Sequence, residues 1–513
     1  MENQKTMTPQ KDPFVAGLDK LLSFLPPAED LSDEQNAKVA EIRGLMDSIE
    51  RSQSTQKTSS TEDGTPPVPN VTFNIREDNT LEITGSNCKE DSLTINNEYD
   101  GRKVTHIAPS AFRNSKFKKI ELPDTLTHIG GSAFEHSRIQ SIAIPASVTC
   151  IENEAFKCSS IQSVVFAGNF CTLGENVFRE CNSLIEANMP SQLTEIPEAT
   201  FMRCNKLTSI EIPRNIKVIH AHAFSWCRSL KSIEIPNSVE VIKHRAFMLC
   251  DQLKEINGMK NISQIGEEAF FSTPWLEKND SEFVVIGTTL LRYRGQNSTV
   301  TIPENVTHIG YRAFSSCIYT NQLFYDYDYR GNSYITHIVI PSKVEEIEKE
   351  AFADCVNLKK IEFSNPNIRI RDKAFANCPI VTEDHQGFQM LNDMLVYYHG
   401  SSPKIKISSQ SRRILPLAFG SQHNAKFKQV ILDEGVCQLD ARSFHHCYID
   451  KLIVSDTVVH IDPDAFSNKS MFGSGVGRIF CTKNSPMVAI AKRLKFSLTI
   501  VSRFRLRRML KKI

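Results

Sequence analysis

Phenylalanine recurs along this chain at nearly constant intervals, mostly directly after an alanine. Most of the intervals are 22 or 23 residues long, and the exceptions are 25, 38 and 44. A fixed period of this length indicates one structural unit that is repeated and stacked. Such an array places function on an extended surface, so the sequence constrains the architecture far more than the ligand. The fourteen positions are Phe112, Phe134, Phe156, Phe178, Phe201, Phe224, Phe247, Phe270, Phe314, Phe352, Phe375, Phe419, Phe444 and Phe466.

The unit that ends at Phe247 illustrates how each coil is expected to fold. Ile233 and Ile235 alternate with polar residues, and Pro236 follows directly. The alternation predicts a short strand with one buried face, which ends at the proline because proline has no N–H to donate. The Ala-Phe-x-x-Cys segment that closes the unit suits a short helical or 3-10 turn. Since one unit cannot bury its apolar side alone, we expect stacked coils with a continuous column of phenylalanine rings.

The pattern from Leu230 to Cys250, L-x-x-I-x-I-P-x-x-V-x-x-I-x-x-x-A-F-x-x-C, resembles the BspA-like leucine-rich-repeat family. The similarity extends over residues 71–496. It implies a leucine-rich-repeat-like β-solenoid that binds proteins and is not an enzyme. Members of the family are often surface proteins of bacteria or protists that attach to host matrix or to other cells. A host matrix or cell-surface protein is therefore the partner that the resemblance implies.

The net charge and the first residues of the sequence are relevant to the partners and the cellular location of the protein. The 60 Lys and Arg residues nearly balance the 59 Asp and Glu residues, and the formal net charge of +1 gives no overall attraction to nucleic acid. The chain begins without a basic segment followed by an apolar one, and it has no apolar run long enough to span a membrane. The default expectation is therefore a cytoplasmic protein. The resemblance instead implies a cell-surface location or secretion by a non-classical route, and both alternatives stay open.

Eight of the fourteen cysteines stand at one position of the repeat. A column at one position of the unit is most simply a small buried residue, so we expect free thiols, with disulfides or metal as the alternatives. No C-x-x-C pair occurs, and phosphate-binding-loop, H-E-x-x-H and G-x-S-x-G motifs are missing from the sequence. We therefore expect no cofactor, no small-molecule substrate and no catalysis. Eight cysteines lie three residues after a repeat phenylalanine: Cys181, Cys204, Cys227, Cys250, Cys317, Cys355, Cys378 and Cys447.

The chain divides into five expected segments. Residues 1–51 predict an amphipathic helical hairpin. This hairpin either folds on itself, covers the end of the solenoid or docks on a partner. A Ser/Thr/Pro-rich linker follows at 52–69, and a solenoid cap of short strands at 70–104. The repeats occupy 105–482, and a capping helix with a basic tail occupies 483–513.

Both 44-residue intervals contain an extra motif. Residues 283–295 align without gaps with residues 388–400, and each segment predicts a hairpin of two short strands, with a tight turn at residues 287–288 or 392–393. Because the motif occurs twice, we interpret it as an alternative coil.

The 38-residue interval contains a tyrosine-rich insertion that no neighbouring unit has. Insertions in solenoids project from one face, and Tyr and Arg are enriched at interface hot spots. A self-packed hairpin is the alternative. The candidate partner-binding residues are Phe324, Tyr325, Asp326, Tyr327, Asp328, Tyr329 and Arg330.

The C-terminal tail is basic and amphipathic. It suits contact with a membrane surface or with nucleic acid, and it equally suits a solvated tail that shields the end of the solenoid. The candidate tail contacts are Arg503, Arg505, Arg507, Arg508, Lys511 and Lys512.

Overall fold

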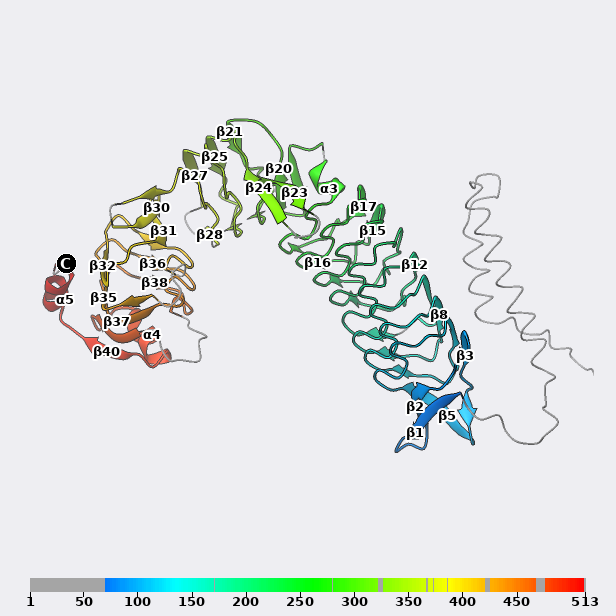
Figure 1. Ribbon diagram of the computed structural model, residues 1–513. Coiled ribbons are helices and arrows are strands. Elements are labelled where there is room, and N and C mark those ends of the chain that lie inside the picture. The colour runs from blue at the N-terminus through cyan, green and yellow to red at the C-terminus, as the bar shows by residue number, and fades with distance from the viewer. Residues whose placement is uncertain are drawn as a thin grey trace, which may run out of the picture. The chain divides into compact units, whose positions relative to one another are not determined.

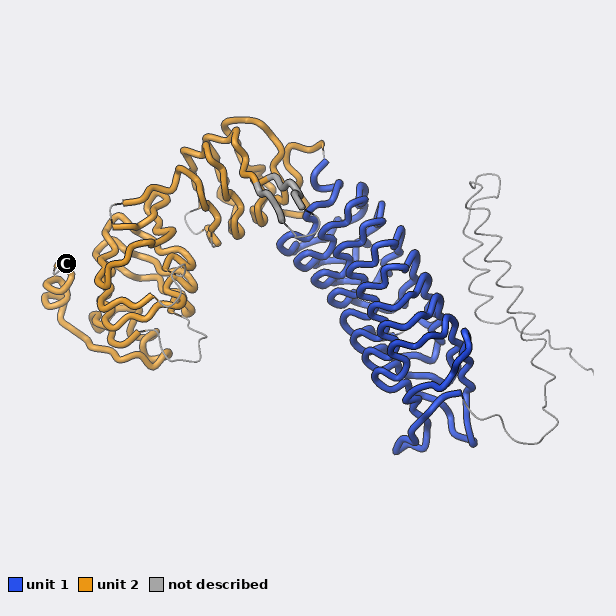
Figure 2. The backbone as a smooth tube through the Cα atoms, in the orientation of Figure 1, with its two compact units in different colours: residues 1–278 blue, residues 279–513 orange. Residues whose placement is uncertain are grey.

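The computed structural model describes residues 70–511, apart from 170, 279, 322–325, 366–367, 372, 385, 420–424 and 467–475 (Figure 1). The expected N-terminal hairpin and linker therefore lie outside the described residues. The chain divides into two compact units, residues 1–278 and 279–513 (Figure 2), and the described residues of each form a stack of coils.

The first described strands build the cap of the first unit. β1 (Val71–Ile75) and β2 (Leu81–Ser86) pair antiparallel, and β2 then pairs parallel with β5 (Arg102–Ile107). β4 (Glu98–Tyr99) joins β5 through a turn at residues 100–101, where both residues have positive φ. The cap thus converts an antiparallel start into the parallel stacking of the coils.

Two parallel ladders run along the first unit, because most coils contribute two short strands in the same register, and each ladder is divided into two sheets. The first ladder continues from β5 through β7 (His128–Ile129), β9 (Cys150–Ile151) and β11 (Thr172–Leu173), and its second sheet contains β13 (Glu195–Ile196), β14 (Val218–Ile219), β16 (Val241–Ile242) and β18 (Gln264–Ile265). The second ladder contains one sheet of β3 (Ser92–Thr94), β6 (Lys119–Glu121), β8 (Ser141–Ile144), β10 (Ser163–Phe166) and β12 (Glu186–Ala187), and another of β15 (Ser232–Ile235) and β17 (Glu255–Gly258). Helix α3 (Pro274–Glu277) follows the last of these coils.

The Ala-Phe segments form a third ladder made of turns. The 3-10-type bond is present, since the Ala223 N–H donates to the His220 carbonyl at 3.3 Å, but the next N–H does not repeat it. The Phe224 N–H instead donates to the Ala246 carbonyl of the following coil at 2.8 Å. This alternation requires a left-handed residue on each side of the phenylalanine, and here His222 has φ 58° and Trp226 has φ 66°. A continuous helix is excluded, because a helix directs all of its N–H groups along its own axis.

The phenylalanine column is continuous within the first unit. Successive rings from Phe112 to Phe270 stack with centroids between 5.0 and 5.5 Å apart. None of these rings is more than 2% exposed. The column thus forms the centre of a core that every coil extends.

The second unit opens with a hairpin, β19 (Phe283–Ile286) and β20 (Thr289–Tyr293), and contains a matching one, β30 (Phe388–Leu391) and β31 (Met394–Tyr398). The turns fall at 287–288 and 392–393, as the sequence predicts. In each case the second strand continues a parallel ladder. The remaining strands of the ladders are β21 (Thr299–Thr301), β22 (His308–Ile309), β25 (His337–Ile340), β26 (Glu346–Ile347), β27 (Lys360–Phe363), β28 (Arg369–Ile370), β29 (Thr382–Glu383), β32 (Lys404–Ile407), β33 (Arg413–Ile414), β34 (Lys426–Phe427), β35 (Gln429–Leu432), β36 (Gln438–Leu439), β37 (Tyr448–Val454) and β38 (His460–Ile461).

The C-terminal end continues beyond the expected last strand. We expected the strands to end near Cys481, the last residue of β39 (Val476–Cys481). The chain instead forms α4 (Met487–Arg493), returns as β40 (Ser497–Ile500), which pairs parallel with β39, and ends in α5 (Arg503–Leu510). Within the described residues, no helix is long and apolar enough to cross a bilayer.

Candidate protein-binding surfaces

The tyrosine-rich insertion leaves the coil between two rings that remain in direct contact. Phe314 and Phe352 are 38 positions apart, yet their rings stack with centroids 4.4 Å apart. The Phe314 N–H donates to the Ala351 carbonyl at 3.0 Å, as it would to the next coil of ordinary length. The insertion is therefore an addition to the coil, and the core closes without it.

The insertion is a two-stranded antiparallel hairpin. β23 (Ser315–Asn321) pairs with β24 (Asp326–Gly331), and the register places Tyr319 opposite Tyr327 and Cys317 opposite Tyr329. Of the candidate contacts, the five from Asp326 to Arg330 lie in β24, and Arg330 is exposed. Phe324 and Tyr325 lie outside the described residues.

The base of this hairpin is held by its neighbours. The Asn332 N–H donates to the Phe314 carbonyl at 2.8 Å, and the Asn332 side-chain amide donates to the Gly295 carbonyl at 3.1 Å. At Gly331, a Cβ would lie 2.0 Å from the Asp354 carbonyl, so only glycine permits this approach. The hairpin is therefore built on a fixed base.

The basic tail is a helix that packs on the second unit. Leu506 and Leu510 are 2% and 4% exposed and form a cluster with Ile431 of β35 and Ile453 of β37. The Ser502 hydroxyl caps the helix by accepting the Arg505 N–H at 3.3 Å. The tail thus covers an apolar surface that the strands would otherwise expose.

That apolar surface explains why the tail docks there. Alternate residues of β35 and β37 face the core, and Ile431 and Ile453 face away from it at a position that carries exposed glutamates, Glu234 and Glu362, in other coils. Other coils carry Val165, Val339 or Lys406 at the same position, so an apolar residue there does not by itself reveal a docking surface in the sequence.

The candidate cations of the tail divide into two groups. Arg503 pairs with Asp456 at 3.2 Å and Arg507 with Glu434 at 3.5 Å, so these two join the helix to the sheet. Arg505, Arg508 and Lys511 are exposed. Lys512 lies outside the described residues.

The cysteine column is a ladder of buried free thiols. Each Sγ donates to the carbonyl of the phenylalanine one coil earlier, as Cys227 does to Phe201 and Cys250 to Phe224, both at 3.2 Å. Burial raises the pKa of the Cys181 thiol to about 12. Cys317 departs from the expected column, because its backbone belongs to β23. These thiols serve packing, since a reactive cysteine needs a lowered pKa and access to solvent.

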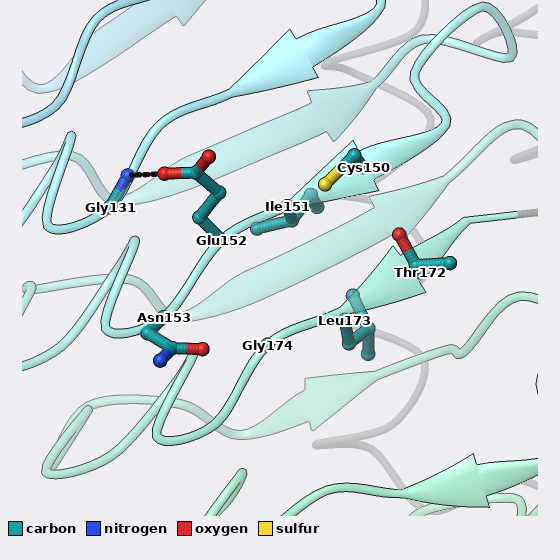
Figure 3. Close-up of a pocket in the computed structure, with 8 residues that line it drawn as sticks. All are labelled: Gly131, Cys150, Ile151, Glu152, Asn153, Thr172, Leu173 and Gly174. Carbon is teal, nitrogen blue, oxygen red and sulfur yellow. Dashed lines mark hydrogen bonds between the residues drawn. The ribbon is translucent and has the colours of Figure 1, made fainter.

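A shallow hollow of about 380 Å³ lies on the first unit, where glycines replace larger residues (Figure 3). Glu152 projects over it and is already engaged, because its Oε2 accepts the Gly131 N–H at 2.8 Å and its Oε1 lies 3.5 Å from Nε2 of His128. Among the described residues, the Cys150 thiol makes no hydrogen bond to His128, its neighbour in register. The hollow therefore lacks a nucleophile and base in contact. The lining residues are Gly131, Cys150, Ile151, Glu152, Asn153, Thr172, Leu173 and Gly174.

Over the described part of the chain, no group of three or more His, Cys, Asp or Glu side chains is arranged to hold a metal ion. The features that remain as candidate sites are the β23–β24 hairpin and α5, and both are surfaces.

Comparison with known protein families agrees with this architecture. The family model for the BspA type leucine rich repeat region matches residues 86–208, 172–289, 322–386 and 389–474 with six copies. The chain is similar in structure to a leucine rich cell surface protein from Faecalibacterium prausnitzii A2-165, at 21% identity over 81% of this chain and 96% of that one, with a TM-score of 0.36.

Two further solved structures are similar. The pneumococcal vaccine antigen PcpA is 16% identical over 86% of this chain and 100% of its own, with a TM-score of 0.35. A leucine-rich repeat protein from Bacteroides ovatus is 16% identical over 85% and 99%, with a TM-score of 0.35. The search of curated proteins gave no match. Because the family model covers well over half of the 513 residues, this chain belongs to the BspA-type leucine-rich-repeat family.

Proposed function

We propose that this chain is a non-enzymatic protein-binding solenoid that attaches to proteins of a host matrix or of another cell surface, with the β23–β24 hairpin as its main contact. Membership of the BspA-type family supports a protein-binding role. The observation that carries the choice of the hairpin is the direct stack of Phe314 on Phe352. Since the core closes without the insertion, the insertion is free to serve recognition.

The composition of the hairpin supports the same role. Tyrosine supplies a large contact area and loses little conformational entropy on binding, and arginine adds directional hydrogen bonds. The fixed base at Gly331 and Asn332 limits the entropy that the hairpin loses when a partner binds.

The binding test compares three forms of the full chain on beads. They are the wild type, a variant with Tyr325, Tyr327, Tyr329 and Arg330 changed to Ala, and a matched control. The control changes four exposed residues of the first unit to Ala: Glu234, Lys254, Asn257 and Lys260. Beads are measured for retention on surfaces coated with fibronectin, collagen or laminin, and on host cells.

We expect the wild type and the control to be retained alike, and the hairpin variant to lose more than tenfold in affinity, because two hot-spot side chains at about 2 kcal/mol each would exceed that loss. Equal retention of the hairpin variant would refute the assignment of the contact. No retention of the wild type on any surface would refute attachment.

A second candidate is an intracellular scaffold, docked through the N-terminal helices or the basic tail. The outward-facing cations Arg505, Arg508 and Lys511 favour it. Protease treatment of intact producing cells separates the two functions. Loss of the protein while a cytoplasmic marker survives supports attachment, and full protection until lysis supports the scaffold.

A further inference from the structure

Helix α5 presents a second face that its packing leaves open. Successive residues of a helix are about 100° apart, so the side opposite Leu506 and Leu510 is centred on Phe504 and Arg508. Arg505 and Lys511 flank these two, and all four are exposed. We call these four residues the outer face of α5. The Phe504 ring is 81% exposed, the largest value among the exposed large apolar side chains of the described residues.

The charge of the outer face is uncompensated. Arg505, Arg508 and Lys511 have no carboxylate within ion-pair distance among the described residues, whereas Arg503 and Arg507 have one each. Helix α5 itself contains no acidic residue. In a chain whose formal net charge is only +1, this is a local concentration of positive charge.

Apolar exposure continues beside the helix. Ile500, at the end of β40 and four residues before Phe504, is 53% exposed. In the same sheet, Arg478 of β39 is also exposed, and it pairs in register with Ser497 of β40 and with Lys451 of β37. The strands next to α5 thus add an exposed apolar side chain and two cations to this end of the solenoid.

We propose that the outer face of α5 docks this protein on an anionic phospholipid surface. The three unpaired cations attract the headgroups, and the Phe504 ring enters the boundary between headgroups and acyl chains. A folded acidic partner would need a pocket for the exposed ring, whereas a bilayer accepts it without one. Leu506 and Leu510 stay on the solenoid, so the helix lies along the membrane and does not insert deeply. This inference does not depend on the hairpin.

The test uses the full 513-residue chain and sedimented vesicles. Phosphatidylcholine vesicles are compared with vesicles that contain phosphatidylserine as well, at low and at physiological salt. The variants are Phe504→Ala, and a triple variant with Arg505, Arg508 and Lys511 changed to Gln. A matched triple variant removes the same charge from exposed positions of the first unit, with Lys231, Lys254 and Lys260 changed to Gln.

Point variants are needed because removal of the whole tail would uncover Ile431 and Ile453 and create a new sticky surface. Circular dichroism and elution volume confirm that each variant stays folded. The four substituted residues are exposed, so the fold has no reason to depend on them.

We expect binding only to the anionic vesicles, with weakening as salt rises. The triple variant of α5 should lose on the order of 100-fold in partition, since each cation near such a surface is worth about fivefold. Phe504→Ala should lose several-fold, and the matched triple variant should bind like the wild type. Equal loss in the matched variant would overturn the assignment to α5. Binding to duplex DNA or polyglutamate without binding to vesicles would overturn the lipid surface.

Discussion

The ring of Tyr293 stacks on that of Phe314, with centroids 5.2 Å apart and planes 29° apart. Tyr398 contacts Phe419 with centroids 5.4 Å apart and a larger tilt of 39° between the planes. In both 44-residue intervals, the second strand of a hairpin thus supplies a tyrosine at the place of the missing phenylalanine. The extra motif is a coil of the array with a different backbone path.

The two tyrosines are each followed, two residues later, by a glycine that makes room for them. A Cβ on Gly400 would lie 2.4 Å from the Tyr398 hydroxyl and 2.4 Å from the Gln386 carbonyl oxygen. We expect Gly400→Ala to destabilise the second unit by about 1–3 kcal/mol, because the Tyr398 ring is buried and the other crowded atom belongs to the backbone. Hydrogen exchange of peptides from both units measures the loss. Gly131→Ala is the matched control, since its nearest atom would be at 3.4 Å, and equal protection in both variants would contradict the crowding.

A buried ion pair stabilises the second unit. Arg413 and Asp440 are 7% and 9% exposed, with a 2.9 Å contact between Arg413 Nη2 and Asp440 Oδ2, and Arg413 also donates to the Ile368 carbonyl at 2.7 Å. Asp440→Asn should cost about 3–5 kcal/mol in free energy of unfolding, because it leaves a buried guanidinium without its counter-charge.

Denaturant unfolding of three variants tests this pair. The double variant Arg413→Met with Asp440→Leu should cost less than Asp440→Asn alone, since no buried charge remains. The control is Lys217→Met, which breaks an exposed pair with Glu240 and should cost about 0–1 kcal/mol. A large loss in the control, or none in Asp440→Asn, would be inconsistent with this account.

The buried thiols make the free energy of unfolding depend on pH in the alkaline range. Burial raises the pKa of both Cys181 and Cys447 from 9.0 to about 12. Above pH 9 the unfolded chain loses these protons while the folded chain keeps them, so the free energy of unfolding falls as pH rises from 9 towards 12. The urea concentration at the midpoint of unfolding, measured at pH 7, 9 and 10.5, should therefore be lowest at pH 10.5.

Changing Cys181 and Cys447 to Ala should reduce this decrease, because the ionising groups are gone. An unchanged slope would mean that the two thiols do not link folding to pH. Reaction with a disulfide reagent at pH 8 gives a second measurement, and we expect the buried column to react only after unfolding.

The next prediction concerns the packing of α5 on β35 and β37. Leu506→Ala together with Leu510→Ala should release α5 from the strands, because each buried Leu→Ala change costs about 2–5 kcal/mol of stabilising free energy. Peptides from 503–511 and from 429–432 should then exchange hydrogen faster, and the exposed Ile431 and Ile453 should promote aggregation. Phe504→Ala is the control. Because the Phe504 ring is exposed, its removal should change neither the hydrogen exchange of these peptides nor the aggregation of the protein.

The period of the phenylalanines was enough to predict the coils and the core, and the resemblance of the full repeat pattern to the BspA-like family predicted the family. The period was also enough to align the two inserts and to place their turns. Tyr293 and Tyr398 were not predicted as core rings. The repeat was traced through phenylalanines alone, so a tyrosine that occupies the same place in the core was overlooked. The alignment of the two inserts already contained both tyrosines.

Two other features depend on packing that local preference does not encode. His222 and Trp226 adopt the left-handed conformation although neither is glycine, since the hydrogen bonds to the next coil outweigh the steric cost. The tail was predicted as amphipathic, but its apolar side could not be assigned a partner until Ile431 and Ile453 were seen to face outward. A hairpin was one of two alternatives for the tyrosine-rich insertion, and the structure pairs its strands from residues 315 and 331 onward.

The contact between Phe314 and Phe352 has a consequence for how such proteins change over generations. A segment that leaves the coil after Phe314 and returns at Asn332, whose N–H donates to the Phe314 carbonyl, can lengthen, shorten or be exchanged without changing the distance from this coil to the next. Selection can therefore diversify this segment while folding stays constant, much as hypervariable loops diversify on an antibody frame. The same junction is the natural position for grafting a foreign peptide into the scaffold.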